Sequence, residues 1–150
     1  MMTVREIPLE ATYPLRMKIL RPGGDLAERY FDQDRLADVF HLGVFAGNTC
    51  ISIGSFYPEG HAELPANTPF RLRGMATDTA YQGSGAGTLL LRHALQRLEQ
   101  SGADLLWCNA RIKAVPFYER LGLHSKGELF EVPRIGPHYL MFLRFGRGGN

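Results

Sequence analysis

The sequence lacks the features that mark several large classes of protein. Its two cysteines, Cys50 and Cys108, are too few for a disulfide framework and form no metal-ligand spacing. We expect two reduced, largely buried thiols and no bound metal. No stretch of about 18 apolar residues is present, and the N-terminal MMTVREIPLE lacks the apolar core of a signal peptide. The protein is therefore expected to be cytoplasmic and not to enter a membrane.

An excess of charge of one sign is also missing. The 17 basic and 15 acidic residues nearly balance, and the basic ones are scattered along the chain, which argues against a nucleic-acid partner. Apolar residues make up 45% of the sequence, which is ordinary for a folded globular protein. The length of 150 residues fits one domain over residues 1–150, with 146–150 as a frayed tail.

The first half of the chain shows the patterns of a strand, two helices and a hairpin. The hydroxyl of Thr12 and the proline at Pro14 are typical of a helix start. Alternating apolar residues on both sides of Gly47-Asn48 predict the hairpin. The expected elements are a short edge strand over 3–9, a helix from 12 to 20, a short helix within 25–35 and paired strands within 38–57.

The second half predicts a strand–helix–strand crossover followed by a helix and two strands. Leu91, Ala94, Leu95 and Leu98 recur at helical spacing, and Gly102 is suited to end that helix. Because the helix lies between two strands, those strands are expected to be parallel neighbours. The expected elements are a crossover over 70–109, a helix over 114–121, and antiparallel strands over 123–132 and 138–145, joined by a rigid, bulged connection.

The glycine-rich stretch from Gln82 to Thr88 precedes the amphipathic helix. A helix N-terminus offers unpaired N–H groups and positive potential, and glycines let a phosphate approach the main chain closely. A Walker loop would need Gly-Lys-Ser/Thr, whereas Gly87 is followed directly by Thr88. A dinucleotide loop would need G-x-G-x-x-G directly after a strand, whereas the spacing here is G-x-G-x-G and residues 78–81 intervene. A mere tight turn does not explain three glycines at alternate positions.

Two motifs resemble those of the GNAT superfamily of N-acetyltransferases. Gln82-Gly83-Ser84-Gly85-Ala86-Gly87 matches the signature Q/R-x-x-G-x-G/A at every specified position. Phe117-Tyr118-Glu119-Arg120-Leu121-Gly122-Leu123 is similar to the family's F/L-Y-E-K/R-L-G-F. The resemblance extends to the order of elements along nearly the whole chain. It implies a mixed α+β fold, with a mostly antiparallel sheet of about six to seven strands flanked by about four helices.

The resemblance implies acetyl-coenzyme A as donor, a primary amine as acceptor, and direct transfer without metal or covalent intermediate. The main chain of the glycine stretch would bind the coenzyme pyrophosphate, and the preceding strand would bind the pantetheine arm. Arg111 stands where the family often has an asparagine, so Asn109 is expected to replace it. The residues expected at the coenzyme are Met75, Ala76, Thr77, Gln82, Gly83, Ser84, Gly85, Ala86, Gly87, Thr88, Asn109 and Tyr118.

The chemistry requires an acid for the leaving sulfur and a base for the attacking amine. Tyr118 matches the tyrosine that the family uses as acid, and a phenol with a pKa of about 10 stays protonated at neutral pH. The alternative interpretation is that Tyr118 is only a residue of an amphipathic helix, without a catalytic role. Many family members carry a glutamate on the strand that here contains Arg73. The base is therefore open among His138, Glu128, Glu131 and Asp78, of which His138 is the most interesting.

The acceptor is left open by the sequence. Arg16, Arg21 and Arg73 would favour an amine that bears a carboxylate, because guanidinium groups bind carboxylates bidentately; the other interpretation is that they are solvated surface residues. The acceptor would be a small molecule or a peptide, and homodimers are common in this fold. The alternative function is a catalytically idle sensor or protein-interaction domain that binds coenzyme A.

Overall fold

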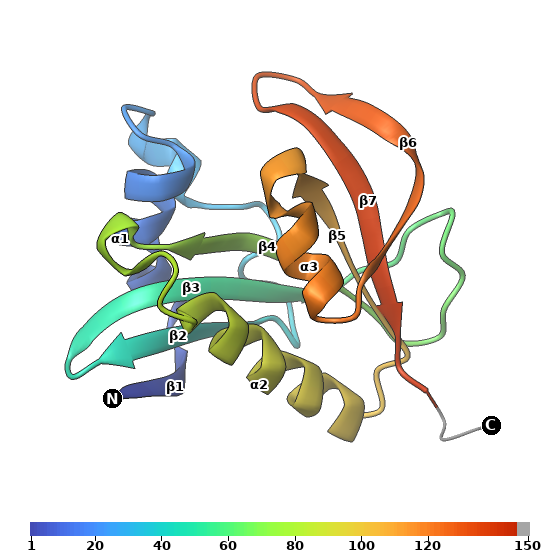
Figure 1. Cartoon of the computed structure of the whole chain (residues 1–150), viewed down its shortest axis with the longest axis horizontal. Coiled ribbons are helices and arrows are strands. Elements are labelled where there is room, and N and C mark those ends of the chain that lie inside the picture. Colours follow the sequence, from blue (N-terminus) through green and yellow to red (C-terminus); the bar gives the residue numbers. More distant parts are fainter. Residues whose placement is uncertain (147–150) are drawn as a thin grey trace. The chain divides into compact units, whose positions relative to one another are not determined.

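The computed structural model describes residues 1–146, which group into two compact units. Unit 1 comprises Met1–Tyr57 and Leu72–Arg97, and unit 2 comprises Pro58–Arg71 together with the described residues from Leu98 onward. The strands follow the order β1-β2-β3-β4-β5-β7-β6 in one seven-stranded sheet (Figure 1). Most of the tail expected at 146–150 lies outside the described residues.

The sheet strands and the helices have the following bounds. The strands are β1 (Met2–Ile7), β2 (Phe40–Ala46), β3 (Thr49–Pro58), β4 (Pro69–Thr77), β5 (Leu105–Arg111), β6 (His124–Val132) and β7 (Gly136–Arg144). The α-helices are α1 (Tyr13–Leu15), α2 (Ala86–Gln100) and α3 (Val115–Arg120). Turns of 3-10 helix span Leu9–Thr12, Leu26–Arg29, Thr79–Tyr81 and Ile112–Ala114, and a π-helical turn spans Arg16–Leu20.

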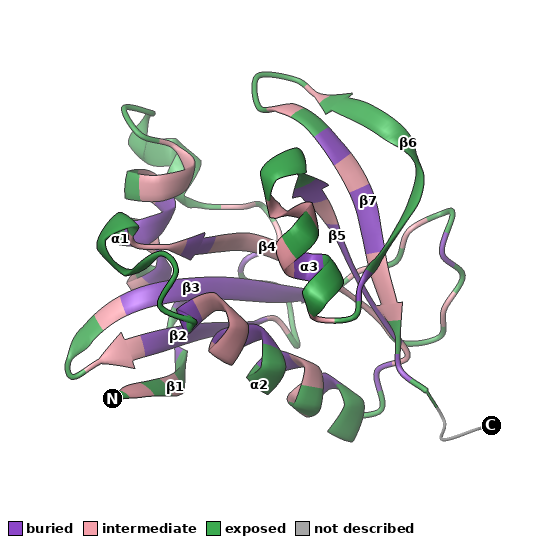
Figure 2. Ribbon diagram, in the orientation of Figure 1, coloured by how far each residue is buried: buried purple, intermediate pink, exposed green. Residues whose placement is uncertain are grey.

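Unit 1 is built on the antiparallel strands β1, β2 and β3. The β2–β3 hairpin turns at Gly47, whose φ of 62° is the left-handed conformation that glycine adopts easily. One buried cluster of this unit consists of Ile7, Leu15, Ile53 and Ala76. The helix α2 buries the apolar side that its 3.6-residue period predicts, whereas its polar positions stay exposed (Figure 2).

The first helix begins earlier than the sequence predicted. The expected cap at Thr12 is wrong, because the Thr12 hydroxyl donates to the Leu9 carbonyl 2.7 Å away inside a preceding 3-10 turn. Helical backbone then continues through α1 and the π-helical turn to Leu20, where the prediction ended it. The short helix within 25–35 is a 3-10 turn whose capping box joins Asp25 and Glu28.

Unit 2 contains the first residues of β4, which pair in parallel with β5, and the C-terminal strands β6 and β7. Pro69–Arg71 of β4 pair in parallel with Leu105–Trp107 of β5, and β7 pairs antiparallel with both β5 and β6. The bulge expected in the β6–β7 connection lies instead within β6, where the register shifts between Lys126 and Phe130. The apolar cluster of this unit consists of Leu64, Leu105, Trp107 and Leu140.

The mixed, mostly antiparallel sheet is confirmed, and its seven strands fall within the expected range. The structure has three α-helices in residues 1–146, one fewer than expected, because the segment within 25–35 closes only one 3-10 turn. None of the helices in this part of the chain combines the length and apolar character that a membrane crossing requires. The two cysteines are free thiols; Cys108 is buried and Cys50 is half-buried. The prediction of a single domain stays a prediction.

Candidate functional site

The glycine turn, residues 82–88, presents a row of backbone donors at the start of α2; residues 82–85 are exposed, Ala86 is buried, and Gly87 and Thr88 are half-buried. Gly83 and Gly85 have φ values of 82° and 90°, and a Cβ added at either position would meet no atom within 4 Å. Within residues 1–146, the N–H groups of Gly83, Gly85, Gly87 and Thr88 donate no hydrogen bond. These donors open a 15-residue helix, so the turn is suited to hold an anion on its main chain.

Two side chains fix the glycine turn to the end of β4. The Gln82 amide donates to the Thr77 carbonyl over 3.3 Å. The Asp78 carboxylate accepts a hydrogen bond from the Ala80 N–H and forms an ion pair with Lys18; both donor nitrogens lie 3.1 Å from its Oδ1 atom. The backbone N–H of Ala80, and then Lys18, lower the pKa of Asp78, so this residue is an ionised cap and a poor base at neutral pH.

A bulge interrupts β4 at Gly74. A Cβ built on Gly54 of β3 would lie 3.6 Å from Leu72 and 3.3 Å from Met75, so both side chains lie on one face. In a regular strand, residues three apart lie on opposite faces, so an extra residue must intervene. Gly74, with φ of 67°, supplies the left-handed conformation that such a bulge requires.

The backbone hydrogen bonds between β3 and β4 agree with this bulge. Asp78 donates to Ile51 at one end, and Glu59 donates to Pro69 at the other. Between these bonds β3 advances eight residues while β4 advances nine, so the pairing is antiparallel with one residue more on β4. A bulged residue leaves backbone groups outside the regular ladder, and these groups are then able to bind a ligand.

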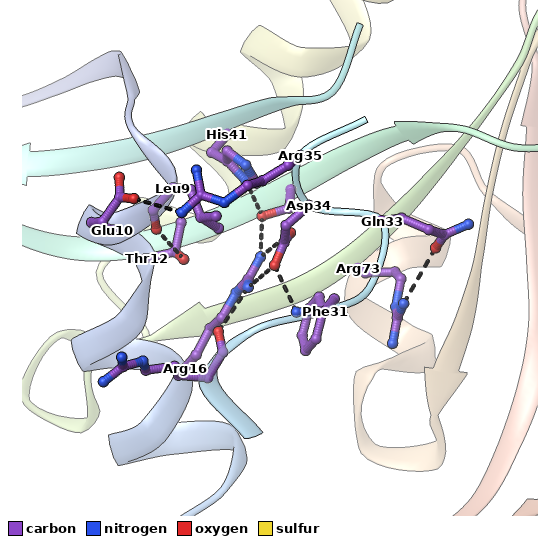
Figure 3. Close-up of polar contacts among 12 residues, drawn as sticks. Leu9, Glu10, Thr12, Arg16, Phe31, Gln33, Asp34, Arg35, His41 and Arg73 are labelled. Atoms are coloured by element: carbon purple, nitrogen blue, oxygen red, sulfur yellow. Dashed lines mark hydrogen bonds and ion pairs between the residues drawn. The ribbon is translucent and has the colours of Figure 1, made fainter. Parts of the chain in front are cut away.

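Arg16 is the centre of a buried polar cluster (Figure 3). Its side chain is 1% exposed and binds both carboxylate oxygens of Asp34, at 2.7 and 3.1 Å. It also donates to Ser55 and Tyr57 on β3, at 2.9 and 3.2 Å, and to the Arg29 carbonyl. Asp34 therefore occupies the place that an acceptor carboxylate was expected to take. This internal ion pair corrects the prediction that Arg16 binds the acceptor.

The pKa values in this cluster reflect burial and pairing together. Burial raises the pKa of Asp34, but hydrogen bonds from Arg16, Tyr57 and the Phe31 N–H outweigh it and leave the pKa below its usual value. Burial and the nearby Arg16 charge lower the pKa of His41, whose Nδ1 lies 2.7 Å from the Ser55 hydroxyl. Asp34 is thus ionised and His41 neutral at pH 7.

Arg21 and Arg73 are less deeply buried than Arg16. Arg21 donates to the Leu20 carbonyl and lies 3.5 Å from the Glu28 carboxylate. Figure 3 shows Arg73 directed toward Gln33, with 3.4 Å between the guanidinium and the amide oxygen. The guanidinium of Arg73 also stacks 4.3 Å from the centre of the Phe31 ring. Both arginines remain candidates for contact with the acceptor.

In unit 2, Tyr118 of α3 is buried on the face of the sheet that carries Cys108. Gly122, at the end of α3, lies against Leu143, which pairs with Leu106 on that same face. Burial, and then the nearby Cys108, raise the pKa of Tyr118 well above its usual value. Burial also raises the pKa of Cys108, to about 12. The Tyr118 phenol therefore stays protonated and able to donate.

His138 and Asn109 lie on the opposite face of unit 2. His138 pairs with Arg111, and Asn109 pairs with Leu140, so these side chains alternate with Cys108 along β5. The Nδ1 atom of His138 lies 2.8 Å from the Gly136 carbonyl, which only accepts, so Nδ1 carries the proton. In the neutral ring, Nε2 is then left as the basic nitrogen. An acid and a base candidate thus lie on different faces.

The predicted residues divide between the two units. Unit 1 brings together the end of β4, the glycine turn and the three arginines, and unit 2 holds Asn109, Tyr118 and His138. Sequence reasoning missed Asp34 and the β3 residues Ser55 and Tyr57, because no local pattern distinguishes them from ordinary loop and strand residues. The glycine at position 74 was the available signal for the bulge.

The comparisons with known proteins agree with one another. The model of the acetyltransferase (GNAT) family matches residues 5–123. The chain is 41% identical over 142 residues to YitI, an uncharacterized N-acetyltransferase of Bacillus subtilis, and the match covers 95% of each protein. The fold is similar to that of the Escherichia coli ribosomal-protein-S18-alanine N-acetyltransferase, with 19% identity, a TM-score of 0.77, and 100% and 97% of the chains covered. An aminoglycoside 6'-N-acetyltransferase complexed with coenzyme A gives 12% identity, a TM-score of 0.74, and coverage of 95% and 96%.

Proposed function

The chain belongs to the GNAT family of acetyltransferases and is an N-acetyltransferase, and we propose that its donor is acetyl-coenzyme A and its acceptor a primary amine that attacks the thioester directly. The observation that carries this proposal is the glycine turn. Four of its N–H groups have no partner within residues 1–146, and no side chain fills the space above Gly83 and Gly85.

The glycine turn fits a pyrophosphate group. Its free donors and the N-terminal end of the α2 dipole both favour a doubly charged anion. The two left-handed glycines let phosphate oxygens come as close as the main chain itself, where a Cβ would intrude. In this proposal the backbone of Met75, Ala76 and Thr77 binds the pantetheine arm, and Asn109 and Tyr118 complete the coenzyme contacts.

The reaction needs the amine to be positioned at the thioester carbonyl, one proton to be given to the leaving sulfur, and one proton to be removed from the amine. A backbone N–H at the β4 bulge polarises the thioester carbonyl, and the neutral amine forms the new C–N bond. The C–S bond then breaks, and the departing sulfur takes the phenolic proton of Tyr118. The excess proton of the amine passes to a base, for which we propose Nε2 of His138. Proton exchange with solvent restores both side chains.

The acceptor is proposed only as a class, a primary amine of a small molecule or a peptide. The names of the structural relatives include both kinds, a ribosomal protein and an aminoglycoside, but at 19% and 12% identity they support the fold alone. Arg21 and Arg73 are the proposed contacts for an acceptor that carries a carboxylate. A cytoplasmic location, a homodimer, and the absence of a metal and of nucleic-acid partners stay predictions.

Calorimetric titration with acetyl-coenzyme A tests the proposal. We expect binding with a dissociation constant in the micromolar range, which corresponds to about 7–8 kcal/mol. Release of the coenzyme thiol is then followed across a broad panel of primary amines. Binding without turnover of any amine would favour a coenzyme sensor, and a failure to bind would remove the donor altogether.

Two substitutions test the assigned protons. Tyr118→Phe keeps the ring and removes the donor, so turnover should fall about a hundredfold while coenzyme affinity stays within about twofold. His138→Gln should lower turnover, because an amide cannot take the amine proton in place of Nε2. Unchanged turnover in either variant would reject that residue's role.

A further inference from the structure

Residues 25–38, called the strap below, are joined to other parts of unit 1 by hydrogen bonds of Asp34 to Arg16 and Tyr57. Within the strap, Asp34 donates its N–H to the Phe31 carbonyl over 2.9 Å, and its carboxylate accepts the Phe31 N–H over 2.7 Å. The Asp34 carboxylate therefore fixes the turn that carries the Phe31 side chain. Any group that holds Asp34 in place also places the Phe31 ring.

Asp34 is held by buried partners from two other elements. Arg16 binds it bidentately, and the hydroxyl of Tyr57 donates to the same carboxylate through a short hydrogen bond. Arg16, Tyr57 and Asp34 are all buried. A buried ion pair adds little net stability compared with apolar packing, but it allows only one geometry. This pair therefore fixes the position of the strap.

Phe31 is placed directly over the bulge of β4. A Cβ on Gly74 would lie 3.1 Å from one ring carbon of Phe31 and 3.6 Å from another, so the ring occupies the space that a side chain at position 74 would need. The guanidinium groups of Arg16 and Arg73 lie 3.9 and 4.3 Å from the ring centre. The ring is half-buried, so one part of it contacts the bulge and another part faces outward.

We propose that Phe31 is a specificity-determining residue for the acceptor amine, and that Arg16 and Asp34 are its positioning residues. This inference rests on the proposed function, in which the thioester carbonyl binds at the β4 bulge. An amine that attacks there must pass the ring, so the ring limits the size of the group next to the amino nitrogen. The substrate class selected is therefore a primary amine with a slender, unbranched carbon chain at the reacting end.

The same ring covers the bulge against water. Water is able to attack a thioester carbonyl that a backbone N–H polarises, and a covering apolar ring slows that loss. Phe31 thus serves two linked purposes in this proposal: it rejects bulky amines and it protects the donor before the acceptor arrives. Both purposes disappear when the ring is removed.

Propylamine and isopropylamine test the size limit, because they have the same composition and differ only in branching at the carbon next to the amino nitrogen. Thiol release is measured for the wild type, Phe31→Ala and Tyr30→Ala. Tyr30 is a matched control, since it is the exposed neighbour in the strap and its ring faces Arg35 at 6.0 Å. Phe31→Ala should raise the kcat/KM ratio of isopropylamine to propylamine by about tenfold or more, and Tyr30→Ala should leave it within about twofold.

Two further measurements decide the proposal if neither amine is a substrate. Without any amine, Phe31→Ala should hydrolyse acetyl-coenzyme A about fivefold faster than the Tyr30→Ala control. Without coenzyme, hydrogen exchange of the amides at residues 73–75 should be faster in Phe31→Ala than in the control. Unchanged exchange would overturn the inference whatever the enzyme binds, whereas lost coenzyme binding in the wild type would overturn the proposed function.

Arg16→Lys tests the positioning role. It retains the buried charge but loses the planar fork that binds Asp34 bidentately. The amine ratio should shift in the same direction as in Phe31→Ala, through the KM for the amine, and coenzyme affinity should stay unchanged. If thermal stability falls while the amine ratio keeps its wild-type value, the ion pair serves stability only and its positioning role is rejected.

Discussion

The glycine turn and the Arg16–Asp34 cluster handle charge in opposite ways. The glycine turn is exposed from Gln82 to Gly85, carries no charged side chain, and has backbone donors without a partner in residues 1–146. The Arg16–Asp34 cluster is buried, contains two full charges, and satisfies nearly all its side-chain donors internally; among residues 1–146, the Nε atom of Arg16 is its one donor without a partner. The backbone donors of the glycine turn are therefore available to an anionic ligand. In the cluster, the Asp34 carboxylate already occupies the guanidinium of Arg16 that such a ligand would need.

The contrast shows why residue type alone is a poor guide to binding. From the sequence, an arginine is expected to bind an anionic ligand, yet the guanidinium of Arg16 binds Asp34, which lies 18 residues later in the chain. Glycines read as spacers, yet Gly83 and Gly85 expose the groups that are suited to bind phosphate. Availability depends on what the remainder of the fold contributes at that place. Four experiments break or sharpen this comparison.

Asp34→Asn should have the largest effect, on stability. It leaves the Arg16 charge buried without its partner, which typically costs about 3–5 kcal/mol in the free energy of unfolding. Urea denaturation measures this cost, and Asp32→Asn, at an exposed position in the same strap, is the control. A loss below about 1 kcal/mol would mean that the charge pair does not hold the strap.

Gly85→Ala should weaken coenzyme binding about tenfold, which equals about 1.4 kcal/mol. The control is Gly102→Ala at the other end of α2, because its φ of 91° matches the 90° of Gly85 and its Cβ would also meet open space. Both changes should cost about 1–2 kcal/mol of stability through left-handed strain. Only Gly85→Ala should reduce the coenzyme affinity measured by calorimetry. Equal coenzyme affinities of the two variants would exclude a binding role for Gly85.

His41→Asn should reduce the dependence of stability on pH. Burial lowers the pKa of His41, so below its ordinary pKa of about 6.5 the unfolded chain binds a proton that the folded chain does not. The wild type should therefore lose stability as the pH falls from 7 to 5, by about 1.4 kcal/mol for each unit of pKa difference. Asp34, whose pKa is lowered, contributes to the slope only below about pH 5.

Denaturation midpoints at pH 7 and pH 5 measure the effect of His41→Asn. The variant should show a smaller difference between the two midpoints than the wild type. An equal difference in both proteins would mean that another group carries the pH dependence.

Ser84→Ala should have the smallest effect. The Ser84 hydroxyl accepts the Ala86 N–H over 3.3 Å, whereas the proposed phosphate donors are backbone groups that the substitution retains. Coenzyme affinity should change by less than about twofold, or about 0.4 kcal/mol. A tenfold loss would show that side chains contribute to the glycine turn, against the distinction drawn above.

The fold was predictable where local rules act. Period-two and period-3.6 patterns gave the β2–β3 hairpin, the crossover through α2 and the C-terminal pair, because burying one face requires these periods. The helix start at Thr12 was wrong, since the preceding 3-10 turn at Leu9 uses the Thr12 hydroxyl internally. The segment within 25–35 gave a single turn because one capping box, without an apolar face, does not sustain a longer helix.

The backbone geometry of the glycine turn was predictable from the sequence, whereas the partners of Arg16 were not. Glycine spacing before a helix is a local pattern with a local physical meaning, so positions 82–88 were visible in the sequence. Asp34 and Tyr57 become partners of Arg16 only through contacts across 18 and 41 residues. No local sequence pattern predicts pairing between residues so far apart along the chain.

By itself, the sequence determined the family and the order of strands and helices, and it predicts a main-chain anion site before α2, because each depends on residues close together in the chain. The tertiary structure decided which charges are free and which are already paired. It buried Arg16 against Asp34, placed Phe31 over the bulge at Gly74, and put Tyr118 and His138 on opposite faces of unit 2. Burial and pairing arise from segments that meet only on folding, and these properties determine what a charged or aromatic side chain can do.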